Sequence, residues 1–72
     1  MIGNRFPDIG DTVRYMDWIP VKNMPGAWTQ EERYAVVIDY RQGTWSCYVR
    51  DTETGKHLWL NSTALTVVKK AR

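Results

Sequence analysis

Residues 34–51, YAVVIDYRQGTWSCYVRD, decide the fold because two strand-like segments flank one turn. The first segment, 34–40, is dense in β-branched and aromatic residues, which are enriched in strands. The turn at 41–44 contains a glycine, and the second segment, 45–51, alternates apolar and polar side chains. An alternation with a period of two is typical of a half-buried strand. The stretch therefore predicts an antiparallel β-hairpin.

The alternation divides the side chains of the second strand between two faces. Trp45, Cys47 and Val49 share one face, and we expect this apolar face to pack into the core. Tyr48 and Arg50 point the other way. An arginine beside an aromatic ring on an outer face either serves an interface or is simply solvated.

Toward the N-terminus, the pattern predicts one more strand and then a long loop. Val13 and Tyr15 alternate with polar neighbours, which indicates a strand near 12–17. Proline and glycine residues interrupt 19–32, so we expect a long loop there. Thr29 is a candidate cap for one short helical turn inside this loop. Long loops in small domains are often functional, which makes this segment the first place to search for a binding surface.

Toward the C-terminus, the chain predicts two further short strands separated by one helical turn. Five short strands without sustained helical periodicity indicate an all-β protein, and closure into a small barrel would remove exposed strand edges. We expect one domain over 1–72, with its core in 10–68 and a short flexible tail at 69–72. The last elements are expected at 57–60 (strand), 62–65 (helical turn) and 66–68 (strand).

The order of these features resembles the SH3-like barrel superfamily. The resemblance begins at Gly10-Asp11-x-Val13-Arg14, continues through the long loop and the hairpin pair, and covers 10–68. It extends to a small accessory subunit of photosystem I, to plasmid-borne dihydrofolate reductases and to small barrels encoded by bacterial viruses. It implies a five-stranded SH3-like barrel with a long loop between strands one and two and one short helical turn before the last strand. It also implies a virus-encoded accessory factor.

Two known activities of such barrels lack their motifs in this chain. Peptide-binding SH3 domains carry a late Pro-x-Asn-Tyr motif, which is absent from 61–68. The barrel reductases use a Val-Gln-Ile-Tyr stretch, whereas 57–60 here reads HLWL. The resemblance therefore implies a fold and not a proline groove or a reductase.

Composition argues against catalysis and metal binding. The chain has one Cys and one His, too few for a zinc site or an internal disulfide. No nucleophile and base or paired carboxylates occur at spacings typical of enzymes, so we expect no enzymatic activity, no cofactor and no metal. The longest apolar runs are far shorter than the roughly 20 residues needed to cross a bilayer. A cytoplasmic protein without membrane contact is the expectation.

Aromatic content is the sharpest functional signal. Four Trp, four Tyr and one Phe make 12% of the 72 residues, more rings than so small a core accepts. Exposed rings favour a binding module that contacts a protein partner or a second copy of itself. Trp18 and Trp28 bracket the long loop and either form the contact surface or fold back over an open barrel end. The candidate partner-binding residues are Trp18, Trp28, Tyr48, Arg50 and Trp59.

Nucleic acid is the alternative partner. The net charge of +2 is too small to select a partner by charge alone, but small barrels can offer aromatic platforms for bases. This alternative requires that basic residues gather on one face beside the rings. The residues concerned are Arg14, Arg33, Arg41, Arg50, Lys56 and Lys69.

Overall fold

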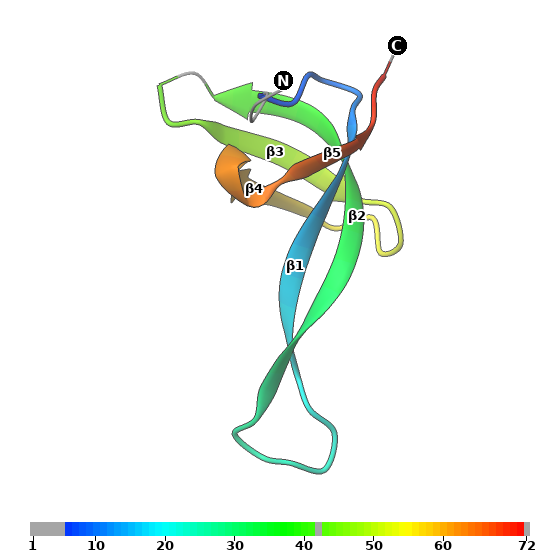
Figure 1. Ribbon diagram of the computed structural model, residues 1–72, viewed down its shortest axis with the longest axis vertical. Helices are drawn as coiled ribbons and strands as arrows, with labels where there is room; N and C mark the ends of the chain where they lie inside the picture. The colour runs from blue at the N-terminus through cyan, green and yellow to red at the C-terminus, as the bar shows by residue number, and fades with distance from the viewer. Residues whose placement is uncertain (1–5, 42, 72) are drawn as a thin grey trace.

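The computed structural model describes residues 6–41 and 43–71, which form five strands and one 3-10 turn (Figure 1). The strands make one antiparallel sheet in the order β4-β3-β2-β1-β5. The predicted all-β class is confirmed. The elements are β1 (Thr12–Pro20), β2 (Trp28–Arg41), β3 (Ser46–Asp51), β4 (His57–Asn61), η1 (Ser62–Ala64) and β5 (Thr66–Lys69).

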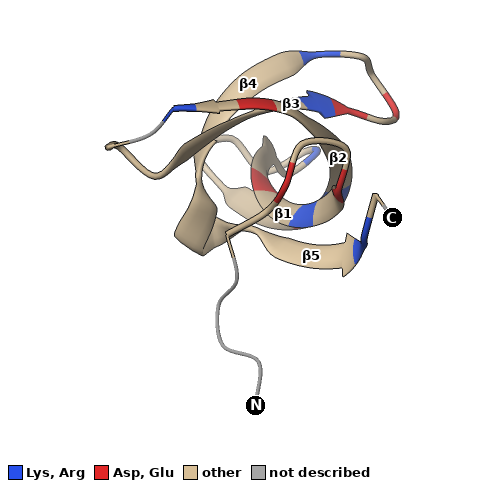
Figure 2. Cartoon of the chain, turned by 90° about the horizontal axis from the view of Figure 1, so that it is seen from above, with Lys and Arg blue, Asp and Glu red and all other residues tan. Residues whose placement is uncertain are grey.

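The sheet curls around its own inner face, as the view from above shows (Figure 2). Across the described ranges no backbone pairing joins β4 to β5, so the two edges of the sheet stay separate. The closed barrel that the sequence analysis expected is therefore not formed. The 3-10 turn η1 carries the chain from β4 to β5, and the side chain of Asn61 caps it by accepting a hydrogen bond from the amide of Thr63.

The core fills the inner face of the curled sheet. Cys47 and Val49 are fully buried there, as the alternation predicted. Burial raises the pKa of the Cys47 thiol, so this side chain packs as a small apolar residue. The other buried apolar residues are Val13, Tyr15, Ala35 and Val37, and the flanking ones are Phe6, Leu58, Leu60, Leu65 and Val67.

Trp45 does not belong to this core, and that prediction was wrong. Its side chain is 63% exposed, and its backbone has φ of 57°, in the left-handed region. The strand begins one residue later, at Ser46, so the alternation that governs Cys47 and Val49 does not extend back to Trp45. A non-glycine residue in this conformation is uncommon, and the Trp45 ring packs at the margin of the core on Phe6.

Half of the predicted loop at 19–32 is strand, which is the second correction. β1 continues to Pro20 and β2 starts at Trp28, in register from Thr12 opposite Val36 to Pro20 opposite Trp28. The loop is reduced to 21–27, closed by a hydrogen bond of 3.0 Å from the Val21 amide to the Ala27 carbonyl. The candidate helical turn at Thr29 is not formed, because this residue lies in β2. Pro20 is tolerated because it ends its strand, where no donor is needed.

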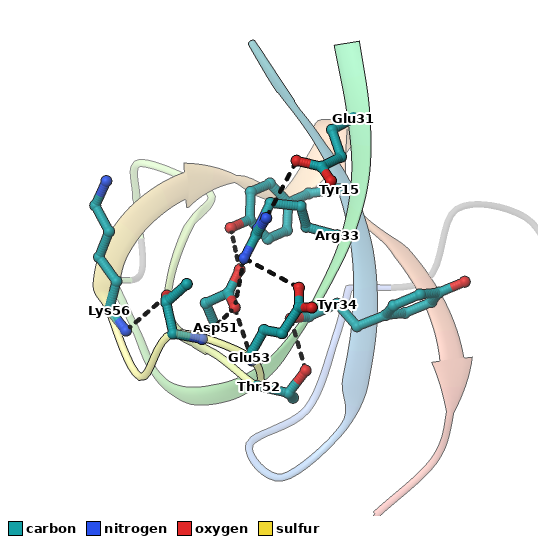
Figure 3. Close-up of polar contacts among 9 residues, drawn as sticks. Tyr15, Glu31, Arg33, Tyr34, Asp51, Thr52, Glu53 and Lys56 are labelled. Carbon is teal, nitrogen blue, oxygen red and sulfur yellow. Dashed lines mark hydrogen bonds and ion pairs between the residues drawn. The ribbon is translucent and has the colours of Figure 1, made fainter. Parts of the chain in front are cut away.

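A polar cluster joins this long β1–β2 hairpin to the body of the sheet (Figure 3). The carboxylate of Asp51, at the end of β3, accepts a hydrogen bond of 2.7 Å from Tyr15 Oη. It accepts two more from Arg33, at 2.7 Å from Nε and 3.2 Å from Nη2. The amides of Glu53 and Thr54 also donate to Asp51, which fixes the β3–β4 turn. The hydrogen bonds from Arg33 hold the pKa of Asp51 well below its usual range, because they outweigh burial, which raises the pKa.

A second buried carboxylate ties the C-terminal end to the start of β1. Asp11 accepts hydrogen bonds from the amides of Asp8 and Ala71 and from Lys70 Nζ, each at 2.9 Å. Burial raises the pKa of Asp11, but these bonds outweigh it and the net direction is down. Of the expected tail at 69–72, Lys69 lies in β5 and the next two residues are bound, while Arg72 lies outside the described residues.

Substitution of Gly10 tests how closely Ala71 packs against the start of β1. Gly10 has φ of 96°, and a Cβ placed on it would lie 2.9 Å from the Cβ of Ala71. We expect Gly10→Ala to lower the free energy of unfolding by about 2 kcal/mol, because it combines an unfavourable backbone conformation with a steric clash. Urea denaturation measures this.

The matched control is Gly55→Ala, where φ is 75° and no atom lies within 4 Å of the added Cβ. It carries only the backbone cost and is expected to be the milder change. Equal losses for the two variants would show that Ala71 does not confine Gly10.

Candidate functional site

The outer face of the β1–β2 hairpin carries large exposed apolar side chains beside the Arg14–Glu32 ion pair. Trp18 pairs with Gln30 and Pro20 with Trp28, so the two Trp side chains are diagonal neighbours on the face opposite the core. Each Trp is 60% exposed. Met16 and Tyr34, also exposed, continue the same face toward the body. We call Met16, Trp18, Trp28 and Tyr34 the hairpin face.

The outer part of this hairpin projects beyond the body (Figure 1). Among the described residues, 15–20 and 28–33 pair in the sheet only with each other, because β5 reaches β1 at 12–14 and β3 reaches β2 from 35 onward. On the opposite side from the Trp rings, Asp17 lies directly across from Glu31. Like charges in this position repel, and Arg33 relieves them through one contact of 3.3 Å to Glu31. The arm therefore combines exposed rings with an acidic reverse side.

A second set of rings lies on the outer face of β3 and β4. Tyr48 pairs directly with Trp59, and their ring centroids are 4.7 Å apart. His57 stacks on the same Tyr48 ring at 5.5 Å, with an interplanar angle of 19°. The three rings form a continuous row across two strands, with Trp59 47% exposed.

Two arginines flank this row. The guanidinium carbon of Arg41 lies 5.0 Å from the centroid of the Trp59 ring, a cation–π contact. Arg50 pairs with His57 across the strands and shares the outer face with Tyr48. We call Arg41, Tyr48, Arg50, His57 and Trp59 the β3–β4 platform.

The nucleic-acid alternative requires six basic residues on one face, and the structure does not gather all of them there. Arg33 turns inward to Asp51 and Arg14 binds Glu32 at 3.2 Å on β1 and β2. Lys69 lies on the edge strand β5. Within the described part of the chain, Arg41 and Arg50 have no carboxylate in ion-pair range. Among the arginines that the structure describes, these two therefore keep a charge that is open to a partner.

A shallow hollow of about 430 Å³ opens beside the platform. Phe6 packs edge to face on Tyr40 and Trp45, with centroids 5.4 and 5.7 Å apart. Arg41 lines the hollow and also covers Trp59, so it connects the hollow to the ring row. The complete lining is Phe6, Pro7, Asp8, Tyr40, Arg41, Gly43 and Trp45.

The structure separates the five predicted partner-binding residues into two surfaces. Trp18 and Trp28 meet on the hairpin face, whereas Tyr48, Arg50 and Trp59 meet on the β3–β4 platform. All three Trp side chains are exposed, so none of them closes an open end of the sheet. Sequence reasoning missed Arg41 and His57 as platform members. The alternation of 57–60 carried a signal for His57, because it places that residue on the same face as Trp59.

The platform and hairpin face present aromatic and charged groups suited to binding. Over the described residues no group of three His, Cys, Asp or Glu side chains is arranged to hold a metal ion. The same residues include no helix long and apolar enough to span a membrane. Comparisons with models of protein families, with curated proteins and with solved structures found no match.

Proposed function

We propose that this chain is a non-catalytic binding module that docks a protein partner through the hairpin face. The observation that carries the proposal is the exposure of Trp18 and Trp28, each 60%, on a two-stranded arm that projects from the body. Exposed Trp residues on one contiguous surface are the side chains that most often dominate binding energy.

The unsupported arm strengthens this interpretation. A hairpin of two strands is marginally stable on its own, and 15–20 and 28–33 have no third strand beside them in the described residues. The opposed Asp17 and Glu31 add like-charge repulsion on the reverse side of the arm. The partner's contact surface is therefore mainly apolar where it meets the Trp rings. Such acidic side chains disfavour nucleic acid at this arm.

We also infer that the curled sheet is an open variant of the SH3-like arrangement. The order of elements supports this inference: a first strand, the connection at 21–27, two tight hairpins, a 3-10 turn and a last short strand.

Photo-crosslinking from Gln30 tests the proposal. Gln30 lies opposite Trp18 on the hairpin face, so a photoreactive residue there reports contacts while both Trp rings remain in place. In cells that express the chain, we expect a discrete crosslinked protein, either a distinct partner or a second copy. Adding Trp18→Ala and Trp28→Ala is expected to reduce this product more than about tenfold, as loss of two central Trp anchors does.

The matched control places the same photoreactive residue at Thr54, an exposed position in the β3–β4 turn. It is expected to give no such product. The two Trp substitutions should leave the thermal midpoint nearly unchanged, because exposed side chains contribute little to stability. A product that persists without either Trp, or that forms equally from Thr54, contradicts docking through the hairpin face.

A further inference from the structure

We propose that the β3–β4 platform binds single-stranded nucleic acid. This surface is separate from the hairpin face, and the inference does not depend on the protein partner proposed above. Its basis is the row of rings formed by His57, Tyr48 and Trp59, together with the two arginines beside it that have no ion-pair partner in the described residues.

The rings supply stacking surfaces. Trp59 remains 47% exposed although its ring contacts both Tyr48 and Arg41. A cation–π contact at an exposed site is weak, so a base can take the place of the Arg41 guanidinium over Trp59. Single-stranded bases stack on aromatic side chains without sequence preference, because every base has a π-face. His57, at the other end of the row, presents a second ring.

The arginines supply the charge that a phosphate backbone requires. Arg50 lies across from His57, and Arg41 lies at the Trp59 end, so the row has a guanidinium at each end. Arg14 and Arg33 cannot serve in the same way, because Glu32 and Asp51 already neutralise them. A guanidinium displaced from Trp59 by a base is free to bind the adjoining phosphate.

The nearby carboxylates do not cancel this charge. Asp39 lies across from Tyr48, and its carboxylate accepts a hydrogen bond of 2.8 Å from the amide of Tyr40. Asp8 lines the hollow and is paired with Lys70 at 3.1 Å. The ring row therefore has a net positive charge, from two arginines and one adjacent carboxylate. The reverse side of the hairpin arm is acidic by comparison.

Arg41 also lines the hollow, so the platform meets the hollow at that residue. Tyr40, in the lining of the hollow, lies across from buried Cys47 and belongs to the inner face, so the hollow is a separate surface. The stacking surfaces of the platform are therefore the rings of His57, Tyr48 and Trp59.

Fluorescence anisotropy with a labelled oligouridylate of about 12 nucleotides, a length within the site sizes of small barrels, tests the proposal. Two neutralised phosphates predict that affinity falls about sevenfold between roughly 50 and 200 mM salt. Trp59→Ala is expected to weaken binding about tenfold at low salt, the loss typical of one stacked base. Arg50→Gln, which removes one phosphate contact, is expected to reduce the salt response to about threefold.

The controls separate this surface from the hairpin face. Trp18→Ala removes an equally large exposed ring, and Lys22→Gln removes a charge at the hairpin tip; both are expected to leave oligouridylate binding unchanged. Circular dichroism shows whether Trp59→Ala folds. If Trp59→Ala does not fold, the salt response of Arg50→Gln still tests the proposal. Lack of binding at low salt, equal affinity for a duplex, or a loss caused by Trp18→Ala and not by the platform variants would overturn the proposal.

Discussion

Replacing Asp51 with Ala is expected to lower the free energy of unfolding by about 3–5 kcal/mol, the usual loss when one partner of a buried ion pair is removed. Asp51 is 2% exposed and accepts hydrogen bonds from Tyr15, Arg33 and two turn amides. Its loss leaves the guanidinium of Arg33, whose side chain is 13% exposed, without its main counter-charge. A domain of this size has about 4–11 kcal/mol in total, so the variant is at the edge of unfolding. Urea denaturation at neutral pH measures the difference.

The control for this prediction is Glu53→Gln, which removes the same charge two residues away. Glu53 is 80% exposed and contacts Arg33 at 3.3 Å, so its removal is expected to cost less than about 1 kcal/mol. Because the folded state lowers the pKa of Asp51, the contribution is present above the unfolded value near 4 and is lost as the pH falls below it. The gap between wild type and Asp51→Ala should therefore narrow in acid. A gap below about 1 kcal/mol at neutral pH would contradict a buried ion pair at Asp51.

The contacts of Tyr15 and Arg33 with Asp51 explain why the sequence did not predict the hairpin arm. Residues 28–32 are mostly polar, and Pro20 and Pro25 interrupt the preceding stretch, so local pattern favoured a loop. The strands continue because each pairs with the other along the full register, and Arg33 and Tyr15 fasten their bases to Asp51. Pairing over such a distance and a hydrogen bond between residues 36 positions apart leave no periodic signal in the sequence.

Where the sequence did carry a periodic signal, it predicted the structure well. The second and third strands, the short fourth strand, the single helical turn and the last strand lie within one or two residues of expectation, except that β2 starts earlier. The alternation from Cys47 to Asp51 also placed Tyr48 and Arg50 on the outer face. Trp45 failed because the same alternation was extended across a strand boundary, where a left-handed residue reverses the direction of the side chain.

The candidate surfaces were predictable in part for the same reason. Alternation identifies which rings face outward, and the count of rings required that some be exposed. It does not identify Arg41, because a bulge near Val37 and Asp39 shifts the register of β2 against β3 and moves Arg41 onto the outer face beside Ser46. Ion pairing, which leaves Arg41 and Arg50 open while Arg33 is engaged, depends on contacts that only the folded chain contains.

Tyr15 is expected to make the folded chain less stable at alkaline pH. Burial first, and then the hydrogen bond to Asp51 and its negative charge, raise the pKa of Tyr15 to about 12, while Arg33 opposes the change. Below about pH 10, the value for an unfolded tyrosine, both states keep the proton and the contribution of the hydroxyl is fully present. Between about pH 10 and 12 only the unfolded state ionises, so the free energy of unfolding falls by up to about 2.7 kcal/mol.

Tyr15→Phe isolates this effect. Its hydroxyl is lost, so the variant is expected to be less stable than wild type at about pH 8 by about 1.5–3 kcal/mol, the range for a hydrogen bond to a charged group. Since the phenyl ring of the variant cannot ionise, the gap should close as the pH rises from about 10 toward 12. Deprotonation of lysines, including Lys70 beside Asp11, affects both chains alike and cancels in the comparison. Urea denaturation at each pH measures the gap, and a gap that stays constant up to about pH 12 would show that Tyr15 ionises as readily in the folded chain as in the unfolded one.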